Sequence, residues 1–532
     1  MSTLTDIVRQ PSDVTSATGV SAAVRDPVVI RLATIASLIS VASTVFFFMK
    51  GDILLYKDTI SHMEIARRVL SSPTAGPAQL GYVWLPLPHI LMLPFVWNNT
   101  LYFDGLAGSI ASMVCFVIAT VLIYKIVYHL TAGNKLAGLV GAFVFMANPN
   151  ILYMQSTPMT ELLLFATMLG GVYGIQRWIQ TKKTVYLFGG GFSLVLSTLS
   201  RYEGWVLSAM LVAVVLYTCL FSQFDWVKTK AIVIIAAATS FLGILFWMGW
   251  NVYYFGNPFD FQDGQYAKPS NWVSSADPQV GHSLVAFKTY WYAVDDNLHL
   301  LVICLAGAGL VLLLARFRFS PVAMPTLATL VFVPFFTVAL DKGQRPLNVI
   351  QITGSLYNVR FGLIMAIPAA ILIGYLASLF SRQSMFGLAL ATVLVVLAGS
   401  FTYDAFQKVD SNIITLQEPL VYATQKGGEV QRYAAAGKYL QDHYKGGLVL
   451  EQSYGNEEVL FDAKVPTSNN IYEGSYKLWQ PALKDPIRSH IVWIVMSNSQ
   501  ADQVFTSLHN SPALKPYRLV YNHLNYKIYE RK

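Results

Sequence analysis

The sequence predicts a mainly α-helical, polytopic membrane protein that carries a small α/β domain at its C-terminal end. Three observations lead to this fold class. Hydrophobic residues make up 54% of the 532 residues and charged residues only 12%, whereas a soluble domain usually has roughly a quarter charged residues. The apolar residues gather in runs long enough to cross a bilayer, and the charges lie between them. These runs end near residue 402, so the tail beyond it is expected to be globular.

About eleven transmembrane helices are expected from these runs, in a membrane domain of residues 30–402. The first run, Ile30 to Met49, lacks the small-residue cleavage site of a signal peptide, so we interpret it as an uncleaved span. Residues 1–29 are polar and are expected to form a disordered cytoplasmic segment. The other runs cover residues 104–127, 137–155, 161–178, 185–200, 204–222, 231–254, 297–315, 321–340, 358–380 and 384–402.

The basic residues between the runs predict the orientation. Every second loop carries Lys or Arg at its membrane edge, as the positive-inside rule requires of cytoplasmic loops. The N-terminus is then cytoplasmic, and residues 50–103, 256–296, 341–357 and everything after Tyr403 lie outside a plasma or inner membrane. Because these loops explain the net charge of +8, we expect membrane lipids and no nucleic acid among the partners. The cytoplasmic basic residues are Lys125, Lys135, Arg177, Lys182, Lys183, Lys228, Lys230, Arg316, Arg318 and Arg382.

Residues 403–532 are expected to form an extracytoplasmic α/β domain. Glu429 to Tyr444 has apolar residues at helical spacing. Short apolar runs bounded by turn residues predict buried strands and a hairpin, and no motif typical of catalysis accompanies them. The predicted strands are residues 447–451 and 491–496, with a hairpin of residues 517–521 and 526–529.

The first outer loop, residues 50–103, contains two segments that we expect to lie at the membrane surface. Lys57 to Leu70 has its apolar residues on one helical face, which is expected to lie against the membrane. Gly81 to Trp97 is apolar but contains three prolines, and proline removes a backbone hydrogen bond that lipid cannot replace. It is also too short to span, so we interpret it as a helix on the outer surface.

Asp58 and His62 are four residues apart and share one face of the first of these helices, whereas Glu64 can pair with Arg68. Asp58 follows the first span closely, so one interpretation is a helix cap or a partner of the helix dipole. A divalent metal held by Asp58 and His62 is another interpretation, although two ligands at one spacing are weak evidence. The sequence leaves metal dependence open.

Glu161 is a second acidic candidate. Thr157 and Pro158 form a helix-start signature, which puts Glu161 in the first turn of the fourth span. The helix N-terminus alone would stabilise a carboxylate there, but acidic groups at this depth are also typical of functional sites. In the predicted orientation, Glu161 and Asp58 face the same compartment.

Two elements place an arginine beside an aromatic residue at the outer end of a span: Ser200-Arg-Tyr-Glu-Gly-Trp205 and Tyr357-Asn-Val-Arg-Phe361. Arginine can bind a phosphate through two parallel hydrogen bonds, and it keeps its charge. The alternatives are that these arginines only reach up to the interface, and that Arg201 pairs with Glu203. Two further basic residues lie in an outer loop against the positive-inside pattern, and an anionic ligand would explain them: Lys342 and Arg345.

In their order along the chain, these features resemble the GT-C glycosyltransferases, especially the branch of protein O-mannosyltransferases and aminoarabinose transferases. The set comprises a first-loop aspartate with a helix running into Ile-Ala-Arg-Arg, the segment Trp-Leu-Pro-Leu-Pro, an acidic residue at the start of a later span, an Arg-Tyr-acidic element and a late Arg-aromatic pair. It covers roughly residues 30–400. No single motif is highly specific, and the ordered set carries the resemblance.

The resemblance implies transfer of a sugar from a polyprenyl-phosphate donor to a hydroxyl of a glycan, lipid or protein acceptor on the extracytoplasmic side, with inversion. It implies that Asp58, at the position of the family's first-loop aspartate, is the general base. Many members have a second acidic residue beside it, but Lys57 and Thr59 flank Asp58 here, so Glu161 is the expected second catalytic carboxylate. The Lys and Arg residues among the expected substrate-binding residues would hold the leaving phosphate. The expected substrate-binding residues are His62, Arg201, Glu203, Lys342, Arg345, Tyr357 and Arg360.

Two other classes of protein share these features. A transporter or flippase of lipid-linked glycans would also have many spans and intramembrane charges, but two similar halves are typical of that class and no internal repeat occurs here. A non-catalytic membrane subunit is the third hypothesis, and the acidic and basic groups gathered on one side argue against it. Sugar transfer by purified protein, as opposed to movement of the donor across vesicles, separates the first two classes.

Overall fold

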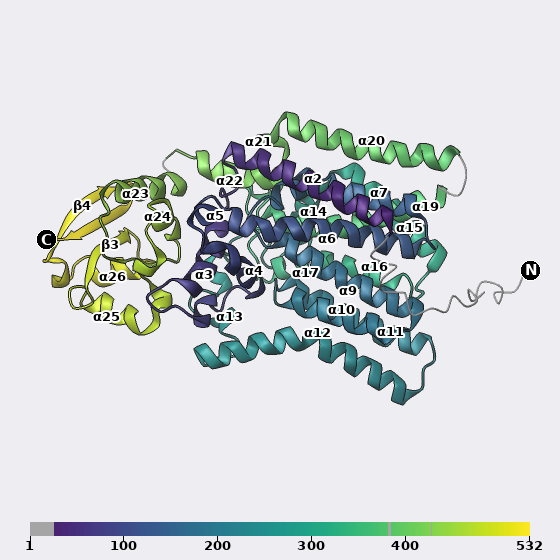
Figure 1. The fold of residues 1–532 in the computed structure, drawn as a ribbon, viewed down its shortest axis with the longest axis horizontal. Helices are drawn as coiled ribbons and strands as arrows, with labels where there is room; N and C mark the ends of the chain where they lie inside the picture. The colour runs from purple at the N-terminus through teal and green to yellow at the C-terminus, as the bar shows by residue number, and fades with distance from the viewer. Residues whose placement is uncertain (1–25, 381–384, 427) are drawn as a thin grey trace, which may run out of the picture.

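The computed structural model describes residues 26–380, 385–426 and 428–532 and shows a bundle of helices with a smaller α/β domain at one end (Figure 1). Most of residues 1–29, for which disorder is predicted, and Arg382 lie outside the described residues. In the described part of the chain, eight helical segments are long and apolar enough to cross a membrane. They are α2 (Pro27–Lys50), α6 (Leu106–Leu130), α9 (Glu161–Thr181), α11 (Glu203–Phe221), α12 (Trp226–Phe255), α15 (Leu300–Phe317) and the compound segments Met324–Asp341 and Val359–Ser378.

The remaining predicted runs also contain helices, and one of them is interrupted. The sequence predicts a single span over residues 137–155, but α7 (Lys135–Met146) ends early and a separate helix, α8 (Pro149–Met154), follows. The break occurs because proline cannot donate to the preceding turn, and because the side chain of Asn148 caps the new helix by accepting a backbone hydrogen bond at 3.1 Å. That predicted span is therefore wrong in its length.

The run 297–315 is interrupted at His299, the run 321–340 contains a tighter turn over Thr329–Val331, and the run 358–380 begins with one over Val359–Met365. The eight longer segments and the further helices of the bundle confirm the prediction of a mainly α-helical membrane protein. The further helices of the bundle are α10 (Thr184–Thr198), α16 (Met324–Ala328), η4 (Thr329–Val331), α17 (Phe332–Asp341), η5 (Val359–Met365), α19 (Ala366–Phe380) and α20 (Met385–Gln407).

Helix α9 lies inside the bundle, where it contacts α6, α10 and α11 (Figure 1). Glycines allow the closest of these contacts, because a Cβ atom on Gly174 would lie only 2.4 Å from the Cα of Gly190 on α10. The helix is buried along nearly its whole length. Its first residue is Glu161, so close packing of α9 holds that carboxylate at one end of the bundle.

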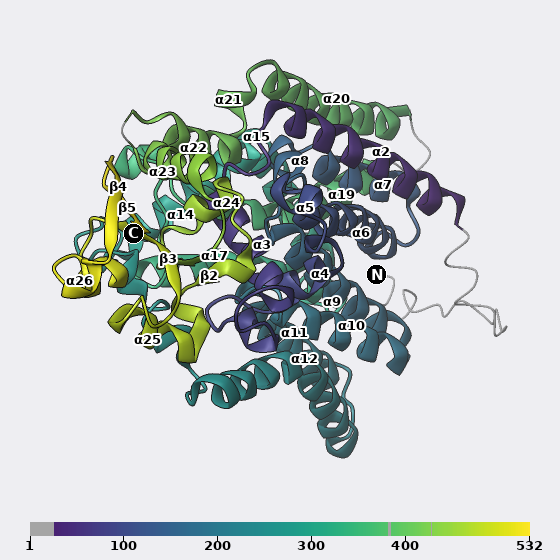
Figure 2. The ribbon, with the colours of Figure 1, turned by 60° about the vertical axis from the view of Figure 1, so that its left-hand side comes forward.

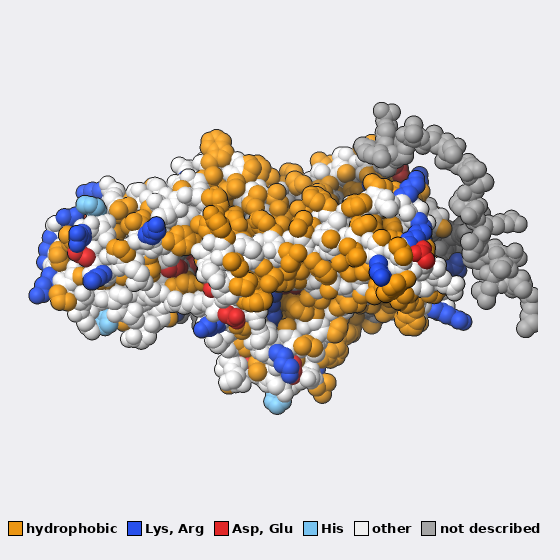
Figure 3. All heavy atoms as spheres, turned by 90° about the horizontal axis from the view of Figure 1, so that it is seen from below, with side chains coloured by type: hydrophobic (Ala, Val, Ile, Leu, Met, Phe, Trp, Pro, Cys, Tyr) orange, Lys and Arg blue, Asp and Glu red, His pale blue; other side chains and the backbone are white. Residues whose placement is uncertain are grey.

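On the face shown in Figure 3, an apolar surface covers most of the helical part of the molecule. The least buried of the long apolar helices are α12 and α15, whose exposed side chains are mostly hydrophobic. Lys and Arg side chains gather at the end of the bundle away from the C-terminal domain, and α2 begins at that end (Figures 1 and 3). A bilayer around the apolar surface would therefore leave the start of α2 and the C-terminal domain on opposite sides.

The short helices α3, α4 and α5 of the first outer loop lie between the bundle and the C-terminal domain (Figures 1 and 2). In α3 (Lys57–Leu70), the apolar residues Ile60, Met63 and Ala66 are buried in a cluster that includes Phe461 of the C-terminal domain. The prediction that this face lies against the membrane is wrong, because helical periodicity shows that a face is buried but not what covers it. The outer loops further contain η2 (Pro77–Leu80), α4 (Leu87–Val96), α5 (Asn99–Phe103), α13 (Asp260–Asp263), η3 (Pro269–Asn271), α14 (Ser283–Leu298) and α18 (Ile350–Thr353).

The C-terminal domain is built on a five-stranded sheet of order β2-β1-β3-β5-β4. Strand β1 pairs in parallel with β2 and β3, and β5 is antiparallel to β3 and β4. Helix α23, the two strands and the hairpin occur where the sequence predicts them, so the α/β prediction is confirmed. The elements are α23 (Glu429–His443), β1 (Leu448–Leu450), α24 (Glu457–Asp462), η6 (Thr467–Asn469), β2 (Asn470–Ile471), η7 (Glu473–Leu478), α25 (Trp479–Lys484), β3 (Ile491–Ser497), α26 (Gln503–Leu508), η8 (Pro512–Leu514), β4 (Tyr517–His523) and β5 (Tyr526–Arg531).

Two short helices connect α20 to this domain: α21 (Val409–Asn412) and α22 (Ile414–Thr424). Ile413 and Leu416 are fully buried in the same apolar core as the bundle helices. The chain therefore packs against the outer end of the bundle before it enters the α/β domain. This packing places Glu418 of α22 beside the residues described next.

Candidate active site

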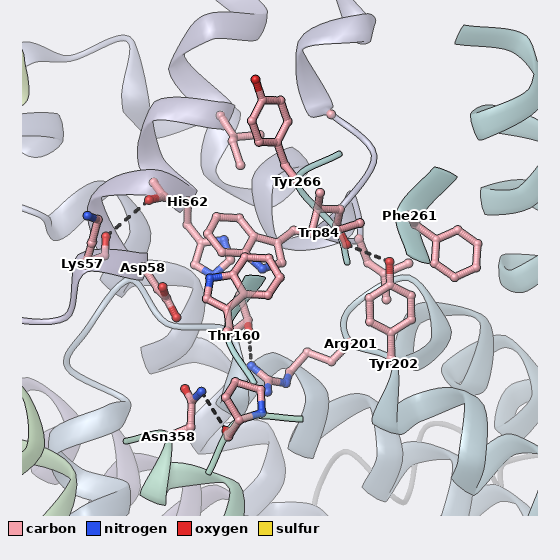
Figure 4. A pocket seen from close by; sticks show the side chains of 18 of the residues that line it. Lys57, Asp58, His62, Trp84, Thr160, Arg201, Tyr202, Phe261, Tyr266 and Asn358 are labelled. Atoms are coloured by element: carbon pink, nitrogen blue, oxygen red, sulfur yellow. Dashed lines mark hydrogen bonds between the residues drawn. The ribbon is translucent and has the colours of Figure 1, made fainter. Parts of the chain in front are cut away.

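A cavity of about 1550 Å³ lies between the outer loops at one end of the bundle and the C-terminal domain. The membrane side of this cavity is the part lined by the bundle and by residues such as Asp58 and Arg345. The domain side is the part lined by the C-terminal domain. Figure 4 shows Asp58, His62 and Arg201 around the space on the membrane side. All predicted site residues except Glu161 line the cavity: Asp58, His62, Arg201, Glu203, Lys342, Arg345, Tyr357 and Arg360.

Arg360, at the start of η5, is surrounded by three carboxylates. Its Nη2 donates to Asp58 Oδ2 at 2.6 Å, and its Nε donates to Glu161 Oε1 at 3.2 Å. Its Nη1 lies 3.5 Å from Glu418 Oε1. Arg360 is 6% exposed, so it does not reach up to the membrane interface, which was the alternative for this residue. It instead joins the first outer loop, α9 and α22 at one point.

Arg201 lies in the connection between α10 and α11 and is held by Glu161 and Glu203. It donates to Glu203 at 3.2 and 3.3 Å, to Glu161 Oε1 at 3.0 Å and to Thr160 at 3.0 Å. These hydrogen bonds use nearly all the N–H groups of a guanidinium. The alternative that Arg201 pairs with Glu203 is therefore confirmed, and the pair is part of a larger network.

Glu161 joins the two arginines and does not line the cavity. It is 3% exposed, its Oε1 accepts from both arginines, and its Oε2 has no hydrogen-bond partner among the described residues. Glu161 was expected to be the second carboxylate beside Asp58, but Arg360 lies between the two. This geometry suits a residue that positions the arginines better than one that contacts a substrate.

Asp58 is the carboxylate of this network that opens to the cavity. Its side chain is 36% exposed, and only one of its oxygens contacts Arg360. Asp58 lies in the first turn of α3, whereas the residue at the N-cap position is Tyr56. The capping interpretation is therefore wrong, and the partial positive charge of the helix N-terminus remains available to stabilise the carboxylate.

His62 is neutral and packed, although it lines the same cavity. Its Nδ1 lies 2.9 Å from His89 Nε2, and its ring is 4.4 Å from the ring of Trp84. Burial, with smaller contributions from the arginines, lowers the pKa of His62 to about 3. Among the described residues, no group of three or more His, Cys, Asp or Glu side chains could hold a metal ion, so Asp58 and His62 gain no third ligand of these types.

The outer loop before η5 supplies the two cations with the fewest constraints. Lys342 is largely exposed and pairs with its neighbour Asp341 at 3.0 Å. Arg345 has no ion pair within the described chain, and its guanidinium lies 5.9 and 6.0 Å from the ring centres of Tyr202 and Phe361. Cation–π contacts of this kind hold a guanidinium in place without neutralising it. Arg345 is therefore a cation that can still accept an anionic partner.

Tyr357 presents its phenol to the cavity close to Asp58. Its backbone pairs with Asn348 in both directions, which fixes the loop that precedes Arg360. Burial, followed by the nearby charge of Asp58, raises the pKa of Tyr357 to about 12. The phenol therefore stays protonated and can donate a hydrogen bond into the cavity.

Glu418 is a site residue that the sequence analysis missed. Its two oxygens accept from the backbone amides of Asn358 and Val359 at 2.8 and 2.9 Å, which fixes the turn that carries Arg360. Asn358 has a φ of 55°, a conformation that asparagine tolerates better than most residues. The available signal was a single acidic residue in an otherwise mostly apolar segment, residues 413–421.

The bundle, its outer loops and the α/β domain together have a GT-C-like fold. No protein-family model and no curated protein matches the sequence. The structure of ArnT from Cupriavidus metallidurans bound to undecaprenyl phosphate matches with a TM-score of 0.57 at 11% sequence identity, over 97% of this chain and 98% of that chain.

Two structures of an oligosaccharyltransferase from Archaeoglobus fulgidus are also similar. One carries a tethered acceptor peptide and matches with a TM-score of 0.49 at 11% identity, over 96% of this chain and 74% of that chain. The other is a complex with zinc and sulfate, with a TM-score of 0.49 at 12% identity, over 94% of this chain and 73% of that chain. At these identities the likeness concerns the fold, and the chemistry must be argued from the residues of the cavity.

Proposed function

We propose that the protein is a glycosyltransferase that moves a sugar from a polyprenyl-phosphate donor to an acceptor hydroxyl on the extracytoplasmic side of the membrane. The observation that carries this proposal is the position of Asp58. It is an accessible carboxylate held by a buried arginine, in a large cavity that also contains Arg345, a cation with no ion pair in the described part of the chain. This reaction requires a base, a site for an anion and a large space between the membrane and the C-terminal domain.

In the proposed reaction, the Asp58 carboxylate takes the proton of the acceptor hydroxyl. The acceptor oxygen forms a bond to the anomeric carbon from the face opposite the phosphate. The bond between that carbon and the phosphate oxygen breaks, and its electron pair leaves on the phosphate. The products are the glycosylated acceptor, with inverted configuration at the anomeric carbon, polyprenyl phosphate and a protonated Asp58. The hydrogen bond from Arg360 orients the carboxylate for this proton transfer.

The phosphate is best received by Arg345 and Lys342, with the arginines of the network behind them. Arg201 and Arg360 are already bonded to carboxylates, so they contribute through their remaining N–H groups and their charge. Glu203 and Glu161 keep these guanidiniums in place, as electrostatic stabilisation of a developing charge requires. Tyr357 and neutral His62 are polar groups of the same wall that can contact the donor sugar.

The prenyl chain is best accommodated along the membrane side of the cavity. The end of the compound span Met324–Asp341 lines this side with apolar residues, Val331, Pro334, Phe335 and Val338. A lipid tail that lies on this face leaves the phosphate near Arg345, since Lys342 and Arg345 directly follow the same span. The basic residues at the other end of the bundle support an extracytoplasmic location for this end.

Purified protein in liposomes, supplied with polyprenyl-phosphate sugars and candidate acceptors, tests this function. We expect release of polyprenyl phosphate together with a glycosylated acceptor, and we expect Asp58→Asn to lower turnover by about 10²–10⁴-fold while donor binding remains. Asparagine keeps the acceptor atom for Arg360 but cannot take the proton. Asp410→Asn, which removes an exposed carboxylate paired with Lys50, is the control and should retain wild-type turnover. Movement of the donor across vesicles without transfer, or normal turnover in Asp58→Asn, would contradict the proposal.

A further inference from the structure

The domain side of the cavity is formed by the loops that follow two parallel strands. Residues 453–455 and 457 follow β1, and residues 472–474 follow β2; both sets line the cavity. In open α/β sheets, ligands bind at the carboxyl ends of the parallel strands. The C-terminal domain therefore presents to the cavity the edge of its sheet that is suited to a ligand.

The loop after β1 is held rigidly, and it presents Tyr454. Glu473 accepts hydrogen bonds from the amides of Ser453 and Tyr454 at 2.8 and 2.6 Å, and Glu457 accepts from Gly455 at 2.8 Å. Carboxylate hydrogen bonds to backbone amides are strong and fix the loop before a ligand arrives. The position of the Tyr454 ring is therefore set by the domain itself.

The Tyr454 ring meets two aromatic residues of an outer loop. It lies 4.7 Å from the ring of Tyr266 and 6.0 Å from that of Trp272. The hydroxyl of Tyr266 accepts a hydrogen bond from Gln503 at 2.6 Å, which ties the outer loop to the C-terminal domain. We call Tyr266, Trp272 and Tyr454 the aromatic cluster. All three line the cavity, and Trp272 is 41% exposed.

The charges on the domain side do not favour an anion. The C-terminal domain contributes Glu429, Glu457 and Glu473 to the lining but no Lys or Arg among the described residues. The two cations of α3 on this side are already paired, Lys57 with Glu429 at 2.9 Å and Arg68 with Glu64 at 2.6 Å. A second phosphate would be repelled here, whereas a neutral ligand with many hydroxyl groups would find hydrogen-bond acceptors.

The size of the cavity and the path to Asp58 complete the argument. A volume of about 1550 Å³ exceeds the roughly 300–1,000 Å³ of a site for one small ligand, so a second ligand can lie beside the donor. Lys57 donates to the carbonyl of Gly455 at 3.1 Å, and Asp58 is the next residue. A ligand on the domain side is thereby brought close to the proposed base.

We propose that the domain side binds a saccharide acceptor. The rings of the aromatic cluster stack on the apolar C–H faces of the sugar rings, and Glu457 and Glu473 border the space occupied by the hydroxyl groups. The inference rests on the proposed function, because it names the class of acceptor for the same site. It excludes a peptide or an anionic headgroup as the part of the acceptor that lies on the domain side.

Binding of neutral linear tetrasaccharides to the full-length protein in detergent, measured by saturation-transfer NMR and tryptophan fluorescence, tests the inference. The panel comprises glucans, mannans and galactans, with a Ser- and Thr-rich peptide as the competing class. We expect at least one tetrasaccharide to bind, and Tyr454→Ala and Trp272→Ala each to weaken it about tenfold. Tyr439→Ala, which removes a ring stacked on His443 outside the cavity, is the matched control and should bind as wild type.

Each outcome supports or overturns the inference. Absence of saccharide binding, unchanged binding in Tyr454→Ala, or Tyr454-dependent binding of the peptide alone would overturn it. Polyprenyl phosphate binding that is unchanged in Tyr454→Ala shows that the variant is folded. Because these measurements need no turnover, they separate the two proposals. Saccharide binding without sugar transfer would support the saccharide subsite and contradict the proposed glycosyltransferase activity. Sugar transfer to a peptide alone would support the activity and contradict the saccharide subsite.

Discussion

Glu161 shows how a single carboxylate organises the membrane side of the cavity. One oxygen of Glu161 accepts from both Arg201 and Arg360, and the residue itself is hidden behind them. Buried charges of this kind cost desolvation energy and remain only when their partners are complete. The arginines are therefore fixed in place by the protein, while Arg345 and Asp58 remain accessible to substrates.

Arg345→Gln should weaken the binding of a polyprenyl phosphate by about 1.5–3 kcal/mol, which is roughly 10- to 150-fold in Kd. The reason is the loss of a charged hydrogen bond from a cation that forms no ion pair among the described residues. Anisotropy of a fluorescent polyprenyl phosphate in detergent measures this affinity. Arg518→Gln, on the outer surface of the C-terminal domain and paired with Glu530, is the control. Equal affinity in Arg345→Gln and in the control would remove Arg345 from the phosphate site.

Arg360→Ala should act mainly on folding. It leaves Glu161 and Glu418 buried with fewer partners, and the loss of one partner from a buried ion pair costs about 3–5 kcal/mol. We expect a clear drop in the melting temperature in detergent. Lys438→Ala removes an exposed ion pair with Asp442 and should change stability by less than about 1 kcal/mol. A melting temperature of Arg360→Ala as high as that of this control would refute the structural role.

Helix α3 connects the parts of the site at the scale of elements. Its apolar face packs on α4 and on Phe461, and its polar face lines the cavity with Asp58 and His62. At its start, Lys57 forms a salt bridge to Glu429 of the C-terminal domain. Near its end, Arg68 forms a salt bridge to Glu64 within the helix. The helix thus fixes the proposed base relative to both sides of the cavity.

The contact between α3 and α4 predicts a pH dependence of stability. Burial lowers the pKa of His62 to about 3 and that of His89 well below its usual value. Between pH of about 3 and 6.5, His62 is protonated in the unfolded chain and neutral in the folded one, and the lowered pKa of His89 acts in the same direction, so stability is complete above pH 6.5 and falls as the pH falls. For His62 the slope in this range is about 1.4 kcal/mol per pH unit, and His89 adds to it in the same direction.

Melting temperatures between pH of about 5.5 and 7.5 measure this effect. The double variant His62→Gln, His89→Gln should lose much of the decrease that wild type shows toward low pH. His523→Gln, an exposed histidine of β4, should keep the wild-type dependence. The same slope in the double variant and in wild type would show that other groups cause the acid destabilisation.

For the whole molecule, the start of α2 and the C-terminal domain lie at opposite ends of the bundle (Figure 1). Accessibility tags should therefore report Lys182 and Lys228 in the cytoplasm and Lys532 outside. The physical reason is that the basic residues at the far end of the bundle favour the cytoplasmic side. Tags at Lys182 and Lys532 on the same side would contradict this topology and would move the cavity to another compartment.

Much of the fold could be predicted because each element has a local cause. Apolar runs of spanning length predict the bundle helices, and alternating or continuous short apolar runs predict the strands of the C-terminal sheet. The same reasoning failed where one local sequence pattern is compatible with two different structures. The break at Asn148 and Pro149 was hidden inside an apolar run, and the covered face of α3 has the same pattern whether lipid or protein covers it.

The sequence by itself determined the membrane class, the C-terminal α/β domain and which residues carry charge at one end of the bundle, because hydrophobicity and charge act along the chain. The tertiary structure decided which of these charges meet. It hid Glu161 behind two arginines, added Glu418 from the tail, left Asp58 and Arg345 accessible, and brought Tyr454 of the C-terminal domain against an outer loop. Contacts between residues separated by tens to hundreds of positions depend on packing of whole elements, and no local pattern encodes them.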